Sequence, residues 1–316
     1  MKLIAAFLKL VRWPNLVFIV LTQALFYQCI IVTTGSRAGH DGAWYLTPLL
    51  FAWLSAASVL IAAAGYIIND YFDLNIDQVN KPDAIIIQKY IRRRWAIGWH
   101  LGLSAAGMVI TAVVSYKIRN WVIGPLNLAA VFLLVFYSTT FKKKFLIGNI
   151  IISLLTAWVV FVLYLSELDV QRFTQDEAYH VAMTKVFQLA VLYGGFAFII
   201  SLVREVIKDM EDIRGDEKYG CRTVPIVWGI PATKVFAGVW LIVSILAVGV
   251  LTVYAVLTGW FIAAAFALAA VALPLVKIFL RLYRAAAAPD FHAISSLIKF
   301  VMLTGILTIL FFKWHL

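Results

Sequence analysis

The stretch PLLFAWLSAASVLIAAAGYIINDYFDLNID, residues 48–77, joins a long apolar run to a set of aspartates spaced i, i+3 and i+7. The same spacing follows another apolar run in KDMEDIRGD, where Asp209 lies 139 residues after Asp70. Residues with this spacing share one face of a helix, so each set is predicted to point three carboxylates the same way. The first Asp motif (residues 69–77) and the second Asp motif (residues 208–216) contribute Asp70, Asp73, Asp77, Asp209, Asp212 and Asp216.

Both motifs belong to a chain with the composition of a membrane protein. Hydrophobic residues make up 63% of its 316 residues, charged residues only 14%, and the mean hydropathy is +0.93. Apolar stretches of about 20 residues are long enough to cross a bilayer as helices. The sequence therefore predicts an all-α, multi-pass membrane bundle of nine transmembrane helices, near residues 12–34, 44–68, 95–115, 120–140, 146–166, 182–203, 235–256, 259–280 and 293–313.

The basic residues indicate how the chain is oriented. A net charge of +11 could suggest a nucleic-acid partner, but Lys and Arg in a membrane protein gather in cytoplasmic loops. With the N-terminus in the cytoplasm, 21 of the 27 Lys and Arg residues fall on the inner side. We therefore expect an integral protein of the inner (cytoplasmic) membrane with no nucleic-acid partner. Both Asp motifs would then lie on the cytoplasmic side, in two long loops over residues 69–94 and 204–234.

The chain is predicted to form a single membrane domain over residues 1–316, because no linker rich in Pro, Gly and Ser divides it. Four predicted helices separate the two Asp motifs. An even number makes the two copies run the same way across the membrane, so the pattern indicates a parallel internal repeat. The acidic segment 167–184 falls on the outer side, where we expect a solvated surface without a catalytic role.

Three carboxylates on one face repel one another unless cations bridge them. Hard cations such as Mg²⁺ bind carboxylate oxygens together with phosphates, so two such motifs indicate a site for a diphosphate held by two Mg²⁺ ions. When an allylic C–O bond breaks, Mg²⁺ and basic side chains would stabilise the departing diphosphate, while apolar helices would keep the carbocation from water. The basic candidates are Arg12, Lys81, Lys142, Lys143, Lys208, Arg214 and Arg222.

Two other classes of membrane protein also use acidic residues. A transporter with ion sites would carry acids at the bilayer midplane, but the centres of the predicted helices lack Asp and Glu. A CDP-alcohol phosphotransferase would place its aspartates in a D-G-x-x-A-R context, which this sequence lacks. The pattern therefore favours an enzyme that acts on an allylic diphosphate.

Five segments resemble motifs of the UbiA superfamily of intramembrane aromatic and lipid prenyltransferases. They are RWPN (12–15), NDYFDLNID (69–77), VNKP (79–82), YSTTFKKKFLIGN (137–149) and REVIKDMEDIRGDEKYGCRTVP (204–225). The resemblance spans nearly the whole chain. It implies a helical bundle around a central cavity with a cytoplasmic cap. It also implies Mg²⁺-dependent transfer of a prenyl group from a prenyl diphosphate to a hydrophobic acceptor.

The resemblance further implies roles for individual residues. One Mg²⁺ would be held by Asn69, Asp70, Asp73 and Asp77, and the other by Asp209, Asp212 and Asp216. The implied diphosphate-binding set is Arg12, Asn15, Asn69, Lys81, Lys142, Lys143, Lys208, Arg214 and Arg222, in which Lys142 or Lys143 is the Lys of the family's YSxxxK pattern. The expected catalytic residues are Asp73, Asp209 and Asp212, with Asp209 as the candidate base for the acceptor proton.

The form of the second Asp motif favours one branch of the family. E-x-x-K-D-x-x-D-x-x-G-D at residues 205–216 is similar to the geranylgeranylglyceryl phosphate geranylgeranyltransferases of ether-lipid synthesis. This implies a geranylgeranyl donor and a prenylglyceryl phosphate acceptor, whose phosphate Arg214 and Arg222 are expected to attract. Homogentisate prenyltransferases carry a similar motif, so an aromatic acceptor is the alternative. The sequence departs from the family pattern at residues 83–94, where it reads DAIIIQKYIRRR.

Overall fold

The computed structural model describes residues 2–37 and 44–315, and its regular elements over these residues are helices without a β-strand. In chain order they are α1 (Lys2–Leu10), α2 (Trp13–Phe26), η1 (Tyr27–Ile31), α3 (Val32–Arg37), α4 (Pro48–Asn80), η2 (Pro82–Ala84), α5 (Arg93–Lys117), α6 (Ile123–Thr139), η3 (Phe141–Lys143), α7 (Ile147–Glu167), α8 (Val170–Gln175), α9 (Glu177–Lys218), α10 (Val224–Leu257), α11 (Phe261–Ala267), η4 (Leu268–Ala272), α12 (Leu273–Arg284), α13 (Ala288–Leu307), η5 (Thr308–Phe311) and α14 (Phe312–His315).

Eight helical segments in the described part of the chain are long and apolar enough to cross a membrane. The segments α2–α3, α11–α12 and α13–α14 each count as one of them, because their helices continue into one another. The shorter apolar helix α6 coincides with the remaining predicted span. The predicted all-α membrane bundle is therefore confirmed, and the protein is an integral, multi-pass membrane protein.

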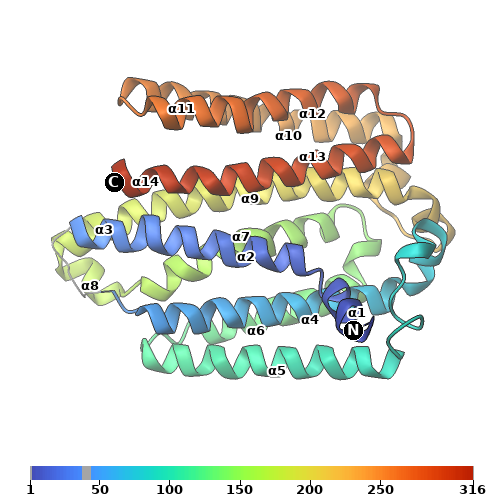
Figure 1. The fold of residues 1–316 in the computed structure, drawn as a ribbon, viewed down its shortest axis with the longest axis horizontal. Coiled ribbons are helices and arrows are strands. Elements are labelled where there is room, and N and C mark those ends of the chain that lie inside the picture. The colour runs from blue at the N-terminus through green and yellow to red at the C-terminus, as the bar shows by residue number, and fades with distance from the viewer. Residues whose placement is uncertain (1, 38–43, 316) are drawn as a thin grey trace.

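Six of these helices form a closed ring. In order around it, α2 packs on α4, α4 on α6, α6 on α7, α7 on α9, α9 on α13, and α13 again on α2. α5 packs against α4 from outside, and α10 and α12 cover α9 and α13 (Figure 1). The ring thus brings the first and last long segments of the chain together around a shared interior.

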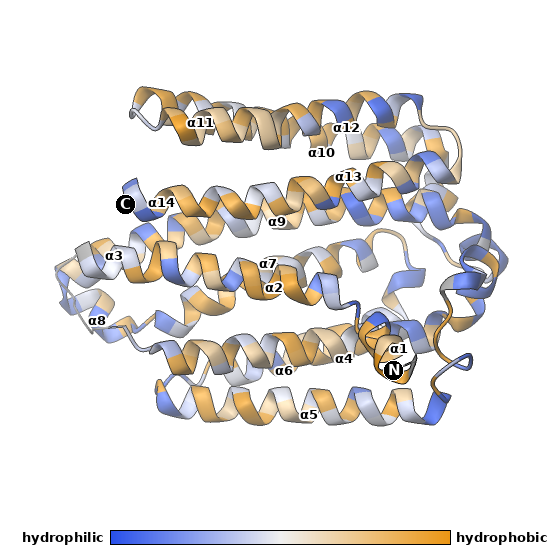
Figure 2. Ribbon diagram, in the orientation of Figure 1, coloured by the Kyte–Doolittle hydropathy of each residue, from blue (hydrophilic) through white to orange (hydrophobic). Residues whose placement is uncertain are grey.

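The two Asp motifs lie on extensions of helices. α4 continues for 33 residues to Asn80, and α9 continues for 42 residues to Lys218. The predicted loops over 69–94 and 204–234 are therefore wrong in large part, and only residues 219–223 separate α9 from α10. Extending a helix keeps its backbone N–H and C=O groups paired, which a long loop would not. Hydrophilic residues gather at this end of the bundle (Figure 2).

A small cap covers the same end of the bundle. It consists of α1 and the segment that follows α4, where Ile86, Ile87 and Ile91 are buried with Leu10 of α1 and Ile67 of α4. Each buried isoleucine contributes about 1.5–3 kcal/mol to the packing. The apolar residues that distinguish this segment from the family pattern therefore hold the cap on the bundle.

The opposite end of the bundle is fastened by Glu167, the last residue of α7. Its side chain is fully buried, and its carboxylate accepts the backbone N–H of Tyr45 at 2.8 Å and of Leu46 at 3.0 Å. The hydroxyl of Tyr27 donates to the carbonyl of Leu46 at 2.8 Å. The prediction of a solvated surface over 167–184 is therefore wrong for Glu167, which ties the start of α4 to α7.

Candidate active site

A cavity of about 790 Å³ occupies the interior of the six-helix ring. Both Asp motifs line it at the end covered by the cap. Farther along α4 the lining changes to Tyr66, then to Ile61 and Ser58. Because a helix rises 1.5 Å per residue, this change from acidic to mainly apolar lining takes roughly 20 Å between Asp73 and Ser58. Such a cavity suits a ligand with a charged head and a long apolar tail.

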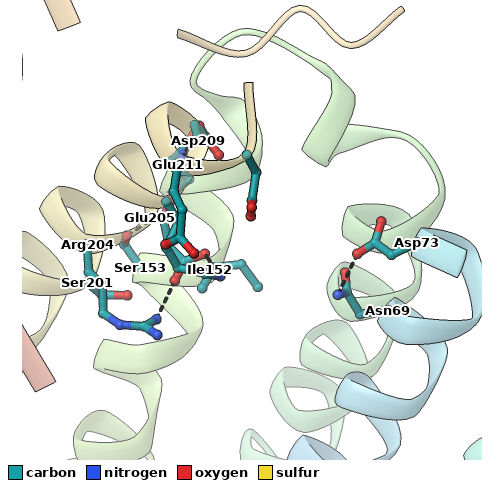
Figure 3. Close-up of polar contacts among 12 residues, drawn as sticks. Asn69, Asp73, Ile152, Ser153, Ser201, Arg204, Glu205, Asp209 and Glu211 are labelled. Carbon is teal, nitrogen blue, oxygen red and sulfur yellow. Dashed lines mark hydrogen bonds and ion pairs between the residues drawn. The ribbon is translucent and has the colours of Figure 1, made fainter. Parts of the chain in front are cut away.

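The first Asp motif is held by two basic side chains. Arg12 donates to Asp70 with an N–O distance of 2.6 Å. Lys142 forms an ion pair with Asp73, whose other oxygen accepts a hydrogen bond of 2.7 Å from the Asn69 amide. Asn69 and Asp73 on α4 face the acidic side chains of α9 across the cavity (Figure 3). Each of these carboxylates thus already lies beside a donor that could also contact a diphosphate.

Local backbone geometry directs both cations into the cavity. Arg12 lies between α1 and α2 in the left-handed region, with φ 52° and ψ 53°, a conformation that is uncommon for a non-glycine residue. The turn before α7 depends on Gly148, where a Cβ atom would lie 2.7 Å from the Cα of Lys142. Glycine therefore lets α7 approach η3 closely enough to bring Lys142 to Asp73.

The second Asp motif is held from α7 and from the end of α4. The Asn149 amide donates to Asp209 at 2.8 Å. Lys81 lies 2.8 Å from Asp212 and 3.3 Å from Glu211. Burial alone would lower the Lys81 pKa, but the two carboxylates outweigh it and raise the pKa above its ordinary value. Lys81 therefore stays charged at the mouth of the cavity.

Asn80, the last residue of α4, connects the two motif-bearing helices. Its amide donates to the backbone carbonyl of Asp212 at 2.9 Å and accepts the backbone N–H of Gly215 at 2.8 Å. A Cβ atom on Gly215 would lie 2.4 Å from the Asn80 amide nitrogen, which no real side chain tolerates. Gly215 is therefore required for this contact, and Asn80 fixes the second motif relative to the first.

We expect Gly215→Ala and Asn80→Ala each to lower the melting temperature, because each disturbs two backbone–amide hydrogen bonds worth about 0.5–1.5 kcal/mol apiece. The two decreases in melting temperature should not be additive. Removing the Asn80 amide makes room for the new Cβ, so Gly215→Ala should cost clearly less in the Asn80→Ala background. Thermal unfolding of the four proteins in detergent checks this, and fully additive shifts would contradict the contact.

A further charged group lies deeper in the cavity wall. Arg204 and Lys208 on α9 both pair with Glu205, at 2.7 Å and 3.4 Å (Figure 3 shows the Arg204 side). Nearer the mouth, His292 at the start of α13 lies 3.0 Å from Glu211. The contact of His292 with Glu211 ties α9 to α13, while the two ion pairs of Glu205 lie within α9.

The cavity gathers most of the residues that the sequence predicts for the site. The predicted residues that line it are Arg12, Asn15, Asn69, Asp70, Asp73, Asp77, Lys81, Lys142, Lys208, Asp209, Asp212 and Asp216. Lys143, Arg214 and Arg222 do not line it and are exposed. Arg214 lies two residues from both Asp212 and Asp216, about 200° around the helix, and so points away from the face that carries them.

Several lining residues escaped the sequence analysis. They are Asn80, Asn149, Arg204, Glu205, Glu211, His292 and Lys299. Asn80, Asn149 and Arg204 lie inside the segments that resemble family motifs, which is a signal that could have found them. Lys299 gave no such signal, because a single lysine in the last apolar run has no motif around it.

The oxygen atoms of the site fit a divalent cation such as Mg²⁺. Within the described residues no three Asp, Glu, His or Cys side chains meet as a metal site, because basic side chains hold several of the aspartates. The buried Oδ1 of Asn69 has no hydrogen-bond partner there. The carboxylates of Asp77 and Asp216 line the cavity and, over the same residues, form neither a hydrogen bond nor an ion pair. Such oxygens are the ligands that Mg²⁺ prefers.

Comparison with known proteins agrees with this site. The UbiA prenyltransferase family matches the chain over residues 29–302. The digeranylgeranylglyceryl phosphate synthase of Thermococcus sibiricus is 28% identical over 183 residues, which is 58% of each chain. The chain thus spans a little less than two thirds of that relative's length.

Solved structures share the fold. A UbiA homolog from Aeropyrum pernix K1 aligns with a TM-score of 0.63 and 15% identity, over 92% of this chain and 96% of that one. A UbiA homolog from Archaeoglobus fulgidus bound to GPP and Mg²⁺ aligns with a TM-score of 0.53 and 13% identity, over 96% and 99%. With the family match covering most of the sequence, the chain belongs to the UbiA prenyltransferase family.

Proposed function

We propose that the protein is a Mg²⁺-dependent membrane prenyltransferase that moves a geranylgeranyl group from its diphosphate to a prenylglyceryl phosphate. The observation that carries this proposal is the cavity itself, which joins two facing Asp motifs at one end to a long apolar interior. Family membership and the names of the relatives support it. The Archaeoglobus homolog was solved with GPP and Mg²⁺, a donor and a cation of the proposed kind.

Two Mg²⁺ ions would be bound, one by Asn69, Asp70, Asp73 and Asp77 and one by Asp209, Asp212 and Asp216. Bound Mg²⁺ would supply Lewis-acid stabilisation of the leaving diphosphate. Arg12, Lys81 and Lys142, now paired with aspartates of both motifs, would turn to the diphosphate oxygens and stabilise the same charge. The supporting observation is that each cation already lies within ion-pair distance of a motif carboxylate.

The rest of the reaction needs a dry cavity and a base. The bond between the prenyl C1 and the diphosphate oxygen breaks, and the acceptor hydroxyl oxygen bonds to C1. The apolar walls keep water from the carbocation. Asp209 would take the hydroxyl proton, because its only hydrogen-bond donor within the described residues is the neutral amide of Asn149. It would act as the base through a carboxylate oxygen that is not bound to Mg²⁺.

The alternative acceptor is an aromatic quinone precursor of the homogentisate type. The names of the relatives favour the lipid, and so does the gathering of Arg204, Lys208 and Lys299 on one part of the cavity wall. An aromatic acid would need one basic contact, whereas a phosphate engages several.

The experiment that tests the function is transfer from radiolabelled geranylgeranyl diphosphate by the purified protein. We expect product with geranylgeranylglyceryl phosphate in Mg²⁺, no product in EDTA, and recovery when Mg²⁺ or Mn²⁺ is restored. Geranylgeranylglyceryl phosphate should give a higher kcat/KM than homogentisate, 1,4-dihydroxy-2-naphthoate or 4-hydroxybenzoate. Full activity in EDTA would rule out the mechanism, and a preference for an aromatic acceptor would remove the lipid assignment alone.

We further propose that the Asp motifs face the cytoplasm of a cell whose inner membrane holds the protein, with the N-terminus inside. The support is the distribution of Lys and Arg and the position of the two termini towards opposite ends of the bundle (Figure 1). We also propose that the protein is a single membrane domain built from a parallel internal repeat. Both motif helices support it, since each is followed by a helix packed on its outer side, α5 on α4 and α10 on α9.

The orientation can be checked with single cysteines at two exposed positions, Gln78 on α4 and Thr174 on α8. In a background with Cys29 and Cys221 replaced by serine, a membrane-impermeant thiol reagent added to intact cells should label Thr174→Cys and spare Gln78→Cys. Labelling of both after lysis is the control. The reverse pattern in intact cells would invert the topology.

A further inference from the structure

A second group of basic side chains lines the cavity, apart from the cations that hold the Asp motifs. It consists of Arg204 and Lys208 on α9 and Lys299 on α13. Over the described residues Glu205 pairs with two of them, at 2.7 Å from Arg204 and 3.4 Å from Lys208. Asp209, which follows Lys208 on α9, also lines the cavity, so three cations and two carboxylates leave this part of the wall with a formal excess of one positive charge.

The packing of α9 against α13 brings Arg204 and Lys299 to the same depth. α9 ends under the cap and α13 begins there, so the two helices run antiparallel, and His292 contacts Glu211 near the mouth. Seven residues, or two helical turns, deeper on both helices lie Lys299 and Arg204. Lys208 lies about one helical turn nearer the mouth on α9 and lines the same cavity.

Two of the three cations have unused hydrogen-bonding capacity. The Nε of Arg204 is buried without a hydrogen-bond partner. Lys299 makes neither a hydrogen bond nor an ion pair over residues 2–37 and 44–315. Lys299 is exposed, so the cost of a buried donor without an acceptor applies to Arg204, and repulsion among the like charges adds to it. Both costs are removed if an anion lies between α9 and α13.

We propose that Arg204, Lys208 and Lys299 form a subsite for the phosphate monoester of the lipid acceptor, separate from the diphosphate site at the Asp motifs. This inference rests on the proposed function and adds a position for the second substrate. A phosphate monoester carries about 1.5–2 negative charges near pH 7, which the three cations would neutralise. Beyond Lys299, Met302 and Ile306 continue the same face of α13 into the cavity, where they would contact the acceptor's apolar chain.

The test compares geranylgeranylglyceryl phosphate with the neutral alcohol geranylgeranylglycerol in wild type and Lys299→Gln. The ratio of kcat/KM for the phosphorylated over the neutral acceptor should fall by about 10- to 100-fold, the effect of losing one charge-assisted contact. Lys299→Arg should keep most of the ratio, and the KM for the donor should change by less than about threefold. Lys277→Gln, which removes an exposed charge on α12 outside the cavity, should leave the ratio as in wild type.

Binding provides a readout that does not depend on turnover. In EDTA and without donor, geranylgeranylglyceryl phosphate should raise the melting temperature of wild type clearly more than that of Lys299→Gln. Two results for Lys299→Gln would overturn the subsite. One is an unchanged ratio of kcat/KM between the phosphorylated and the neutral acceptor, and the other is a higher KM for the donor without a change in that ratio. If wild type transfers prenyl to no acceptor, the proposed function fails, while the melting temperatures still decide the subsite.

Discussion

Replacing Asp73 by asparagine should lower the rate of prenyl transfer at least about 100-fold, and Asp212→Asn should do the same, on the scale of removing a main electrostatic stabiliser. The asparagine keeps the shape of the side chain but loses the charge. In Asp73→Asn the position of Lys142 is lost together with a proposed Mg²⁺ ligand, because Lys142 is paired with that carboxylate. In Asp212→Asn the same holds for Lys81.

Initial rates at saturating Mg²⁺ and donor measure this effect. Asp83→Asn is the matched control, since Asp83 is an exposed carboxylate in the neighbouring η2 and does not line the cavity. It should retain wild-type rates, and melting temperatures should show that all three variants fold. A rate for Asp73→Asn within tenfold of wild type would place the chemistry elsewhere.

The largest expected effect on stability comes from Glu167→Leu. The backbone N–H groups of Tyr45 and Leu46 lose their acceptor, and each unsatisfied buried group costs about 1–3 kcal/mol. The variant should therefore be less stable by about 2–6 kcal/mol and unfold at a clearly lower temperature. Glu167→Gln should lose less, because one carbonyl oxygen remains. Glu177→Gln at the exposed start of α9 is the control, and equal melting temperatures for Glu167→Leu and this control would contradict the role.

Much of the architecture could be predicted from apolar run lengths alone, because a membrane span has a nearly fixed length in residues. Each predicted span overlaps an observed helical segment, including the short α6, and extends beyond its ends by at most four residues. The loops were harder, because polar residues such as those of IRGDEK at 213–218 can either end a helix or extend it beyond the membrane. Here they extend the helix, and α9 ends only at Lys218.

Part of the site could likewise be predicted from the sequence, and part could not. The i, i+3, i+7 spacing correctly predicted that the aspartates of each motif face one cavity. The partners of these aspartates could not be predicted, because Arg12, Lys81 and Lys142 reach them through a left-handed residue, a helix end and a glycine contact that only the folded chain reveals. The same helical periodicity, applied to Arg214, would have shown that it points away.

The closure of the ring by α2 and α13 has a consequence for how the protein is made. A ribosome delivers the chain from the N-terminus, so both Asp motifs enter the membrane before residues 288–307 exist. Until that last segment arrives, the flank between α2 and α9 stays open to lipid, since α13 is the helix that packs on both. The cavity is therefore closed only when α13 joins the bundle, and a nascent chain that stopped short of it would carry both Asp motifs beside an open flank.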